Sequence, residues 1–117
     1  MNKDQSKGTN QIYVQLFSGF QNPKRIRILF ALREKPGIVS DIAKRTNLSQ
    51  SMVSRHLKIL RESGLVNSSR KGNSIFNVLA NHQVVDILDS SRTIVLDKLA
   101  FQSELFQHLS EHPHTPG

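Results

Sequence analysis

The 117-residue sequence predicts a mainly α-helical domain with one small β-hairpin, and three observations lead to this prediction. Apolar residues recur at helical spacing over most of the chain, which indicates amphipathic helices. Near the middle of the chain, only a short turn separates two of these helices. Directly after the second of them, two short runs of strand-forming residues flank Arg70-Lys71-Gly72-Asn73, which is typical of a hairpin.

The most informative stretch is a predicted helix over residues 49–64. Ser49 can cap its N-terminus by accepting a hydrogen bond from a backbone N–H group, and Gly64 stands where a left-handed residue would end it. At about 100° per residue, the two sides of this helix differ in chemistry. Apolar residues occupy one side, namely Val53, Leu57 and Leu60. Polar residues occupy the other side, namely Ser51, Ser54, Arg55 and Lys58.

Two amphipathic helices are predicted near the start of the chain. The first follows a polar segment, residues 1–10, that we expect to be disordered. Its apolar residues are Ile12, Tyr13, Leu16, Phe17 and Phe20. The second begins at Asn22-Pro23, because asparagine caps helices and proline favours the first helical position, and it ends at Lys35-Pro36-Gly37. Its predicted inner face consists of Ile26, Leu29, Phe30 and Leu32.

A third helix is expected over residues 38–46, with Ile42 and Ala43 facing inward. Asn47 follows at a position suited to the left-handed conformation, and Leu48 leads into the helix over residues 49–64. This order of helix, short turn and helix is the layout of a helix-turn-helix, in which a small residue such as Ala43 lets the two helices cross closely.

The hairpin is predicted from strands over residues 65–69 and 74–79. Adjacent apolar residues in the second strand break strict alternation, so the sequence leaves open which of them face the core. The residues concerned are Ile75, Phe76, Val78 and Leu79. A hairpin tipped by Arg70 and Lys71 beside the helix over 49–64 would form a wing, and its cations could reach phosphates or a minor groove. Basic hairpin tips also serve solubility, which is the alternative interpretation.

A long helical pattern runs from the N-cap residue Asn81 to about residue 110, with a break expected near Asp89-Ser90-Ser91. Its apolar stripe is wider than a small winged domain can cover. We therefore infer a homodimer built from the first and last helices. The predicted interface residues are Ile12, Leu16, Phe20, Leu88, Val95, Leu99 and Phe106. An intrachain core or the surface of another protein are the alternatives. Residues 11–110 form the predicted domain, and residues 111–117 a disordered tail.

Charge is distributed unevenly along the chain. The formal net charge is +7, yet residues 1–80 alone carry +10 and residues 81–117 carry −3. Such a basic region suits nucleic acid, acidic membranes or acidic proteins. The sequence has no apolar stretch of the roughly 20 residues that a membrane span needs, so we expect a soluble, cytoplasmic protein. It contains no cysteine, which excludes disulfides and thiolate metal sites.

The polar side of the helix over 49–64 has the chemistry of base recognition. Arginine can bind guanine through two hydrogen bonds, glutamine can pair with adenine, and serine can bind bases or phosphates. Two such helices about one DNA turn apart would read a two-fold symmetric operator in double-stranded DNA. The predicted DNA-binding residues are Gln50, Ser51, Ser54, Arg55, Lys58, Arg70 and Lys71.

Residues 48–66, which read Leu-Ser-Gln-Ser-Met-Val-Ser-Arg-His-Leu-Lys-Ile-Leu-Arg-Glu-Ser-Gly-Leu-Val, closely resemble the ArsR-type winged helix-turn-helix repressors. Residues 23–29 are also similar to the second helix of that family, and the likeness extends over about residues 12–100. The resemblance implies a dimeric bacterial or archaeal repressor whose first and last helices form the dimer interface. It further implies that four residues face the bases: Gln50, Ser51, Ser54 and Arg55.

The chain departs from this family in its metal sites. Many members sense metals through cysteines near the third helix, here residues 38–45, where this sequence has none. Others use a carboxylate and histidines on the last helix, and the matching positions here cannot form a tetrahedral zinc site. Those positions are Asn81, Gln83, Ile94 and Asp97. His108, His112 and His114 could chelate a metal, but Pro113 and fraying weaken that arrangement, so we predict no metal site and no cofactor.

The sequence therefore predicts a homodimeric, sequence-specific DNA-binding transcriptional regulator that acts as a repressor. It shows no phosphate-binding loop, paired-carboxylate spacing or nucleophile motif, so an enzyme is not expected. One alternative is a winged-helix protein-interaction module that acts through its apolar last helix, and another is non-specific DNA packing. The operator, the regulated genes and any inducer are left open.

Overall fold

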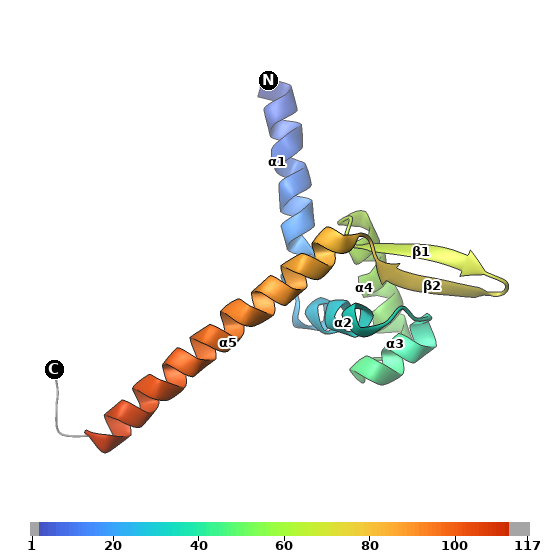
Figure 1. Ribbon diagram of the computed structural model, residues 1–117. Helices are drawn as coiled ribbons and strands as arrows, with labels where there is room; N and C mark the ends of the chain where they lie inside the picture. Colours follow the sequence, from blue (N-terminus) through green and yellow to red (C-terminus); the bar gives the residue numbers. More distant parts are fainter. Residues whose placement is uncertain (1–2, 113–117) are drawn as a thin grey trace. The chain divides into compact units, whose positions relative to one another are not determined.

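The computed structural model describes residues 3–112, with side chains from residue 8 onward. The elements follow in the order α1 (Lys3–Ser18), α2 (Pro23–Glu34), α3 (Val39–Thr46), α4 (Gln50–Glu62), β1 (Val66–Lys71), β2 (Ser74–Leu79) and α5 (His82–Glu111) (Figure 1). Within residues 3–112, these five helices and one hairpin confirm the predicted mainly α fold with a small wing. The chain divides into two compact units, Met1–Val85 and Asp86–Gly117, which are described separately.

Short polar side chains set the helix ends where the sequence predicts them. Asn22 Oδ1 accepts hydrogen bonds from the backbone N–H groups of Lys24 and Arg25, at 2.9 and 3.2 Å, at the start of α2. Asn81 does the same for α5, accepting from the Val84 N–H at 3.1 Å. Each cap satisfies backbone donors that have no partner within their own helix.

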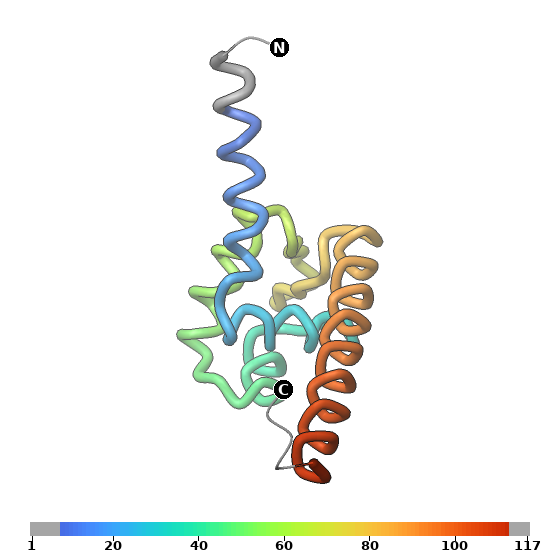
Figure 2. Tube along the Cα trace, turned by 90° about the vertical axis from the view of Figure 1, so that its left-hand side faces the viewer, coloured from blue at the N-terminus to red at the C-terminus, as the bar shows by residue number. Residues whose placement is uncertain are grey.

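The core of the first unit is formed by α2, α3, α4 and the base of the hairpin, and Figure 2 shows these helices gathered together. Its fully buried apolar residues include Ile28, Leu29, Ile42, Val53, Leu57, Leu60, Leu65 and Val66. The prediction for the inner face of α2 is wrong at Ile26, which is 38% exposed. Two residues apart on a helix means about 200° around its axis, so Ile26 cannot share a face with the buried Ile28.

The first helix differs from the prediction at both ends. It begins at Lys3 and therefore includes most of the segment 1–10 that we expected to be disordered. Once a helix is nucleated, each added residue gains one backbone hydrogen bond without a further nucleation cost, which lets the helix extend through polar sequence. It ends at Ser18, so Phe20 lies in the following turn, where its N–H donates to the Phe17 carbonyl at 3.0 Å. Residues 1–2 lie outside the described range.

The structure of the hairpin shows which apolar residues of β2 face the core. Val66 pairs with Leu79 and Lys71 with Ser74, which leaves a two-residue turn whose Gly72 has a φ of 62°. Leu79 is buried, Phe76 is half-buried, and Ile75 and Val78 are exposed. The residue that is almost fully buried in the middle of β2 is polar Asn77. The strand β1 runs to Lys71, so Arg70 and Lys71 belong to the strand rather than to the loop.

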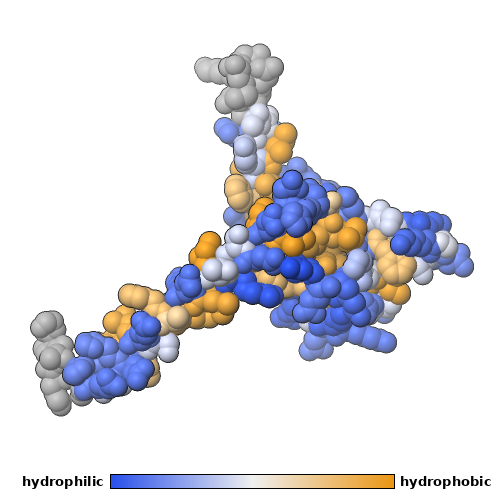
Figure 3. All heavy atoms as spheres, in the orientation of Figure 1, coloured by the Kyte–Doolittle hydropathy of each residue, from blue (hydrophilic) through white to orange (hydrophobic). Residues whose placement is uncertain are grey.

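The last helix, α5, is continuous through the expected break near Asp89-Ser90-Ser91. Ser91 Oγ donates to the Leu88 carbonyl at 2.8 Å and Thr93 Oγ1 to the Asp89 carbonyl at 3.3 Å, so these hydroxyls are satisfied within the helix. Large apolar side chains on this helix are exposed (Figure 3), among them Ile94, Val95, Leu99, Phe101, Leu105, Phe106 and Leu109. No helix within residues 3–112 is long and apolar enough to span a membrane. Residues 113–117 of the predicted tail lie outside the described range.

Candidate nucleic-acid interface

The two sides of α4 are separated as the sequence predicts. Val53, Leu57 and Leu60 are buried in the core of the first unit. The five predicted DNA-binding residues of this helix are all exposed, namely Gln50, Ser51, Ser54, Arg55 and Lys58. Because the buried side holds the helix in place, the exposed side is presented as one row of donors and acceptors on a rigid element.

The N-terminus of α4 is held by its cap. Ser49 Oγ accepts a hydrogen bond from the Met52 N–H at 3.2 Å and lies 3.3 Å from Ser51 Oγ. Asn47, with a φ of 57°, adopts the left-handed conformation predicted for it and turns the chain from α3 into α4. These contacts confirm the predicted helix-turn-helix and place Gln50 and Ser51 in the first turn of α4.

Arg61, which is not among the residues predicted from the sequence, extends this polar row towards the wing. It is exposed, and it lies three residues after Lys58 and seven after Ser54, which places all three on one face of α4. Its Nη1 donates to Ser68 Oγ of β1 at 3.4 Å. The helical spacing was the signal that could have identified it. Through this contact, the exposed face of α4 continues into the hairpin.

The two cations of the wing are exposed and point to different faces of the hairpin. Arg70 and Lys71 are consecutive residues of β1, so their side chains alternate across the pleat. Lys71 Nζ lies 5.7 Å from the centroid of the Phe76 ring, within range of a cation–π contact. The wing therefore presents positive charge on both faces near its turn.

His56 lies behind the exposed row of α4 and is half-buried. Its Nδ1 is 3.4 Å from Arg25 Nη1, which must be the donor because a guanidinium has no acceptor. Burial lowers the pKa of His56, and the positive charges of Arg25, Arg55 and Lys24 lower that pKa further. The neutral imidazole therefore accepts from Arg25, whose Nη2 also donates to the Ser18 carbonyl at 2.8 Å.

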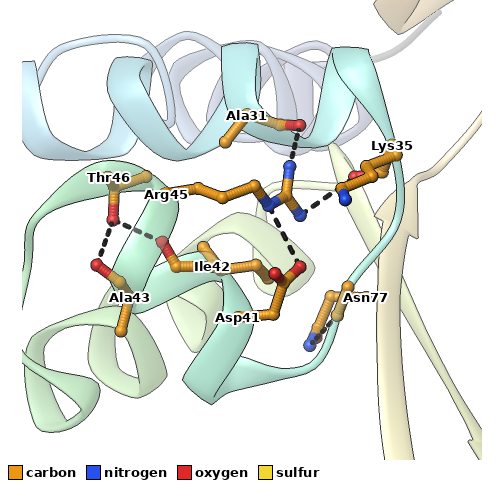
Figure 4. Close-up of polar contacts among 9 residues, drawn as sticks. Ala31, Lys35, Asp41, Ile42, Ala43, Arg45, Thr46 and Asn77 are labelled. Carbon is orange, nitrogen blue, oxygen red and sulfur yellow. Dashed lines mark hydrogen bonds and ion pairs between the residues drawn. The ribbon is translucent and has the colours of Figure 1, made fainter.

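Other cations of the basic region are engaged within the fold. Arg45 donates to the carbonyls of Ala31 and Lys35, at 2.6 and 3.2 Å, and pairs with Asp41 at 3.0 Å (Figure 4). Arg27 Nη1 donates to the Thr46 carbonyl at 2.9 Å. Helix C-termini favour such cations because their last carbonyls have no partner within the helix. The net charge of residues 1–80 therefore overstates the charge that is available to a ligand.

No group of three or more metal-ligating side chains is found in the described part of the chain. The ring centroids of His108 and His112 lie 4.7 Å apart, and His114 falls outside the described residues. Asn81 uses its side-chain oxygen to cap α5.

The predicted dimer residues differ in exposure. Ile12, Val95, Leu99 and Phe106 are exposed, the last at 73%. Leu16 and Phe20 are half-buried. Leu88 is only 2% exposed within the single chain, which sets it apart from the others.

Three core helices, a helix-turn-helix at α3 and α4, and a hairpin after α4 define a winged helix-turn-helix protein. The model of the bacterial regulatory proteins of the arsR family matches residues 22–68, from the start of α2 into β1. Several relatives that match two thirds or more of the chain are named as transcriptional repressors, activators or regulators. The chain belongs to the arsR family.

Two curated relatives illustrate this similarity. The transcriptional repressor SmtB of Mycobacterium tuberculosis is 33% identical over 90 residues, which cover 77% of this chain and 62% of the relative. The chain thus spans less than two thirds of the length of SmtB. The transcriptional activator HlyU of Vibrio cholerae is 30% identical over 89 residues, which cover 76% of this chain and 82% of HlyU.

Among solved structures, the chain is similar to a winged helix-turn-helix DNA-binding domain of Mb0332 from Mycobacterium bovis, described as homodimeric. The TM-score is 0.77 at 21% identity, and the match covers 84% of this chain and 91% of the other. At this identity the similarity concerns the fold.

Proposed function

We propose that this chain is a sequence-specific, double-stranded-DNA-binding transcriptional regulator that acts as a homodimer and represses by occupying its operator. One observation carries the proposal: the side of α4 opposite the core is an exposed row of side chains that match base edges and phosphates. A helix fixed on one side and chemically selective on the other is what major-groove recognition requires.

The exposed residues of α4 and the wing take different roles in this proposal. Gln50, Ser51, Ser54 and Arg55 contact base edges, with Arg55 suited to guanine through two hydrogen bonds. Lys58, Arg70 and Lys71 contact phosphates, where a compact or flexible cation releases counterions without reading sequence. The proposed partner is therefore a DNA duplex.

The homodimer in this proposal covers exposed apolar surface. α1 exposes Ile12, Tyr13, Val14 and Phe17, and α5 exposes the seven apolar residues named above. Single soluble chains rarely leave such surface in contact with water, because burial is favourable by about 25 cal/mol per Å². A second copy brings identical surfaces and places a second α4 on the same duplex.

The regulatory names of the relatives support transcriptional control, and they include both a repressor and an activator. Repression is proposed because a dimer seated on an operator blocks polymerase without needing another contact. A regulator of this kind acts where the DNA is, so we place it in the cytoplasm of a prokaryotic cell. We propose no catalytic activity.

The proposal is tested by light scattering coupled to size exclusion, followed by gel shift with operator fragments selected from a random pool. A dimer of about twice the 13.2 kDa chain mass that shifts selected duplexes more tightly than scrambled ones is expected. A monomer without DNA affinity would refute the proposal and favour a protein-interaction module. Equal affinity for every sequence would indicate non-specific packing.

A further inference from the structure

Asn77 is the polar residue that the fold buries in the wing. It is 1% exposed, although its neighbours on β2 include the exposed apolar residues Ile75 and Val78. Burying an amide is unfavourable unless its hydrogen bonds are satisfied, and an apolar residue in the same place would avoid that cost. The hydrogen bonds of Asn77 must therefore offset the cost of burying its amide.

The contacts of Asn77 join the wing to the loop between α2 and α3. Its side-chain Nδ2 donates to the Gly37 carbonyl at 3.2 Å (Figure 4). Its backbone N–H donates to the same carbonyl at 2.8 Å, and its own carbonyl accepts from the Gly37 N–H at 3.1 Å. Three hydrogen bonds thus connect one residue of β2 to one residue of the helical body.

The other end of the Asn77 amide connects the wing to α4. Asn77 Oδ1 accepts from Ser68 Oγ of β1 at 2.7 Å, and Ser68 Oγ accepts from Arg61 Nη1 at 3.4 Å. A continuous hydrogen-bonded chain therefore runs from the end of α4, across both strands, to Gly37.

Gly37 is a firm anchor for this chain. A Cβ atom there would lie 2.5 Å from Asp41 Oδ2 and 2.6 Å from Arg45 Nη2, so the backbone is packed directly against their ion pair. Arg45 is itself tied to the carbonyls of Ala31 and Lys35. The anchor consequently belongs to the α2–α3 framework rather than to the hairpin.

We infer that Asn77 is a positioning residue for DNA binding, which fixes the wing relative to α4 so that Arg70 and Lys71 are held ready for the duplex. This inference rests on the proposed function. A two-stranded hairpin is marginally stable by itself, so a wing held less firmly against the helices would be ordered at the expense of binding. With the Asn77 contacts, the wing is already ordered in the free protein, so this cost is not paid when DNA binds.

The test uses Asn77→Leu, which keeps the number and branching of the side-chain heavy atoms and removes the side-chain hydrogen bonds, while the backbone bonds to Gly37 remain. Ser68→Ala serves as a milder variant. The matched control is Asn67→Leu, at an exposed asparagine of the same hairpin. Amide hydrogen exchange in the free protein should rise in β1 and β2 for Asn77→Leu, while the amides of α4 keep their protection and Asn67→Leu leaves the wing unchanged. Unchanged exchange in the wing of Asn77→Leu would overturn the inference.

DNA affinity is then measured for Asn77→Leu in two backgrounds, the natural chain and an Arg70→Ala/Lys71→Ala variant. Positioning predicts a loss of about three- to thirty-fold in the first background and almost none in the second, because no wing cations remain to be placed. An equal loss in both backgrounds, or no loss in the first, would overturn the positioning role. Failure of the natural chain to bind any duplex would instead refute the proposed function, and the exchange experiment would still show whether the Asn77 side chain orders the wing.

Discussion

Replacing Lys71 with alanine should flatten the salt dependence of DNA binding while leaving the fold intact. Lys71 is exposed next to the turn of the wing, and its described contact is the cation–π approach to Phe76 at 5.7 Å. At an exposed site such a contact contributes about 0.5–1 kcal/mol, which is small against the stability of a domain. The loss should therefore fall on binding rather than on folding.

The size of the effect follows from counting phosphate contacts. Each contact contributes about 0.9 to the slope of log affinity against log salt, and a homodimer loses one contact in each protomer. The slope should therefore decrease in magnitude by about 1.8. Between 50 and 200 mM salt, the natural chain should lose about twelve-fold more affinity than the variant does.

The assay is fluorescence anisotropy with one labelled operator duplex and one scrambled duplex, each titrated at four salt concentrations. Lys71→Ala should weaken both duplexes by the same factor at each concentration, and Lys71→Arg should retain the slope because it keeps the charge. An unchanged slope for Lys71→Ala, or a loss confined to the operator, would refute the assignment of Lys71 to a phosphate.

Three further predictions concern α4. Arg55→Ala should cost about 1–3 kcal/mol on the operator and relax the preference at one base position in a selection experiment, whereas an equal loss on every sequence would contradict base contact. Leu57→Ala, in the buried core, should lower the free energy of unfolding by about 2–5 kcal/mol in urea titrations, and a smaller change than 1 kcal/mol would argue against its burial. The pKa of His56 is lowered from its ordinary value of 6.5 in the folded chain. As the pH falls, His56 is therefore protonated in the unfolded chain before it is protonated in the folded chain. Its contribution to stability should be complete above about pH 6.5 and decrease below it, and an NMR titration of His56 with a pKa above 6.5 would contradict this reasoning.

Local chemistry made much of the fold predictable. Asn22, Ser49 and Asn81 cap the helices that the sequence assigned to them, because a capping side chain bonds to backbone groups only two or three residues away. Asn47 adopts the left-handed conformation for an equally local reason. The separation of α4 into a buried and an exposed side also followed from spacing alone.

The remaining features depend on contacts between distant parts of the chain. The inner face of α2 was misjudged at Ile26 because periodicity fixes the spacing of a stripe, and only packing selects between Ile26 and Ile28. Asn77 gave no signal, since its partner Gly37 lies 40 residues away in sequence. Arg45 likewise reads as one more surface cation until its backbone partners are seen.

If two copies of α4 read one duplex together, footprinting on a selected operator should show two protected half-sites of inverted sequence. Their centres should lie about 10–10.5 base pairs apart or a multiple of that spacing. A single protected site without two-fold symmetry, occupied by one chain, would show that α4 does not act in pairs.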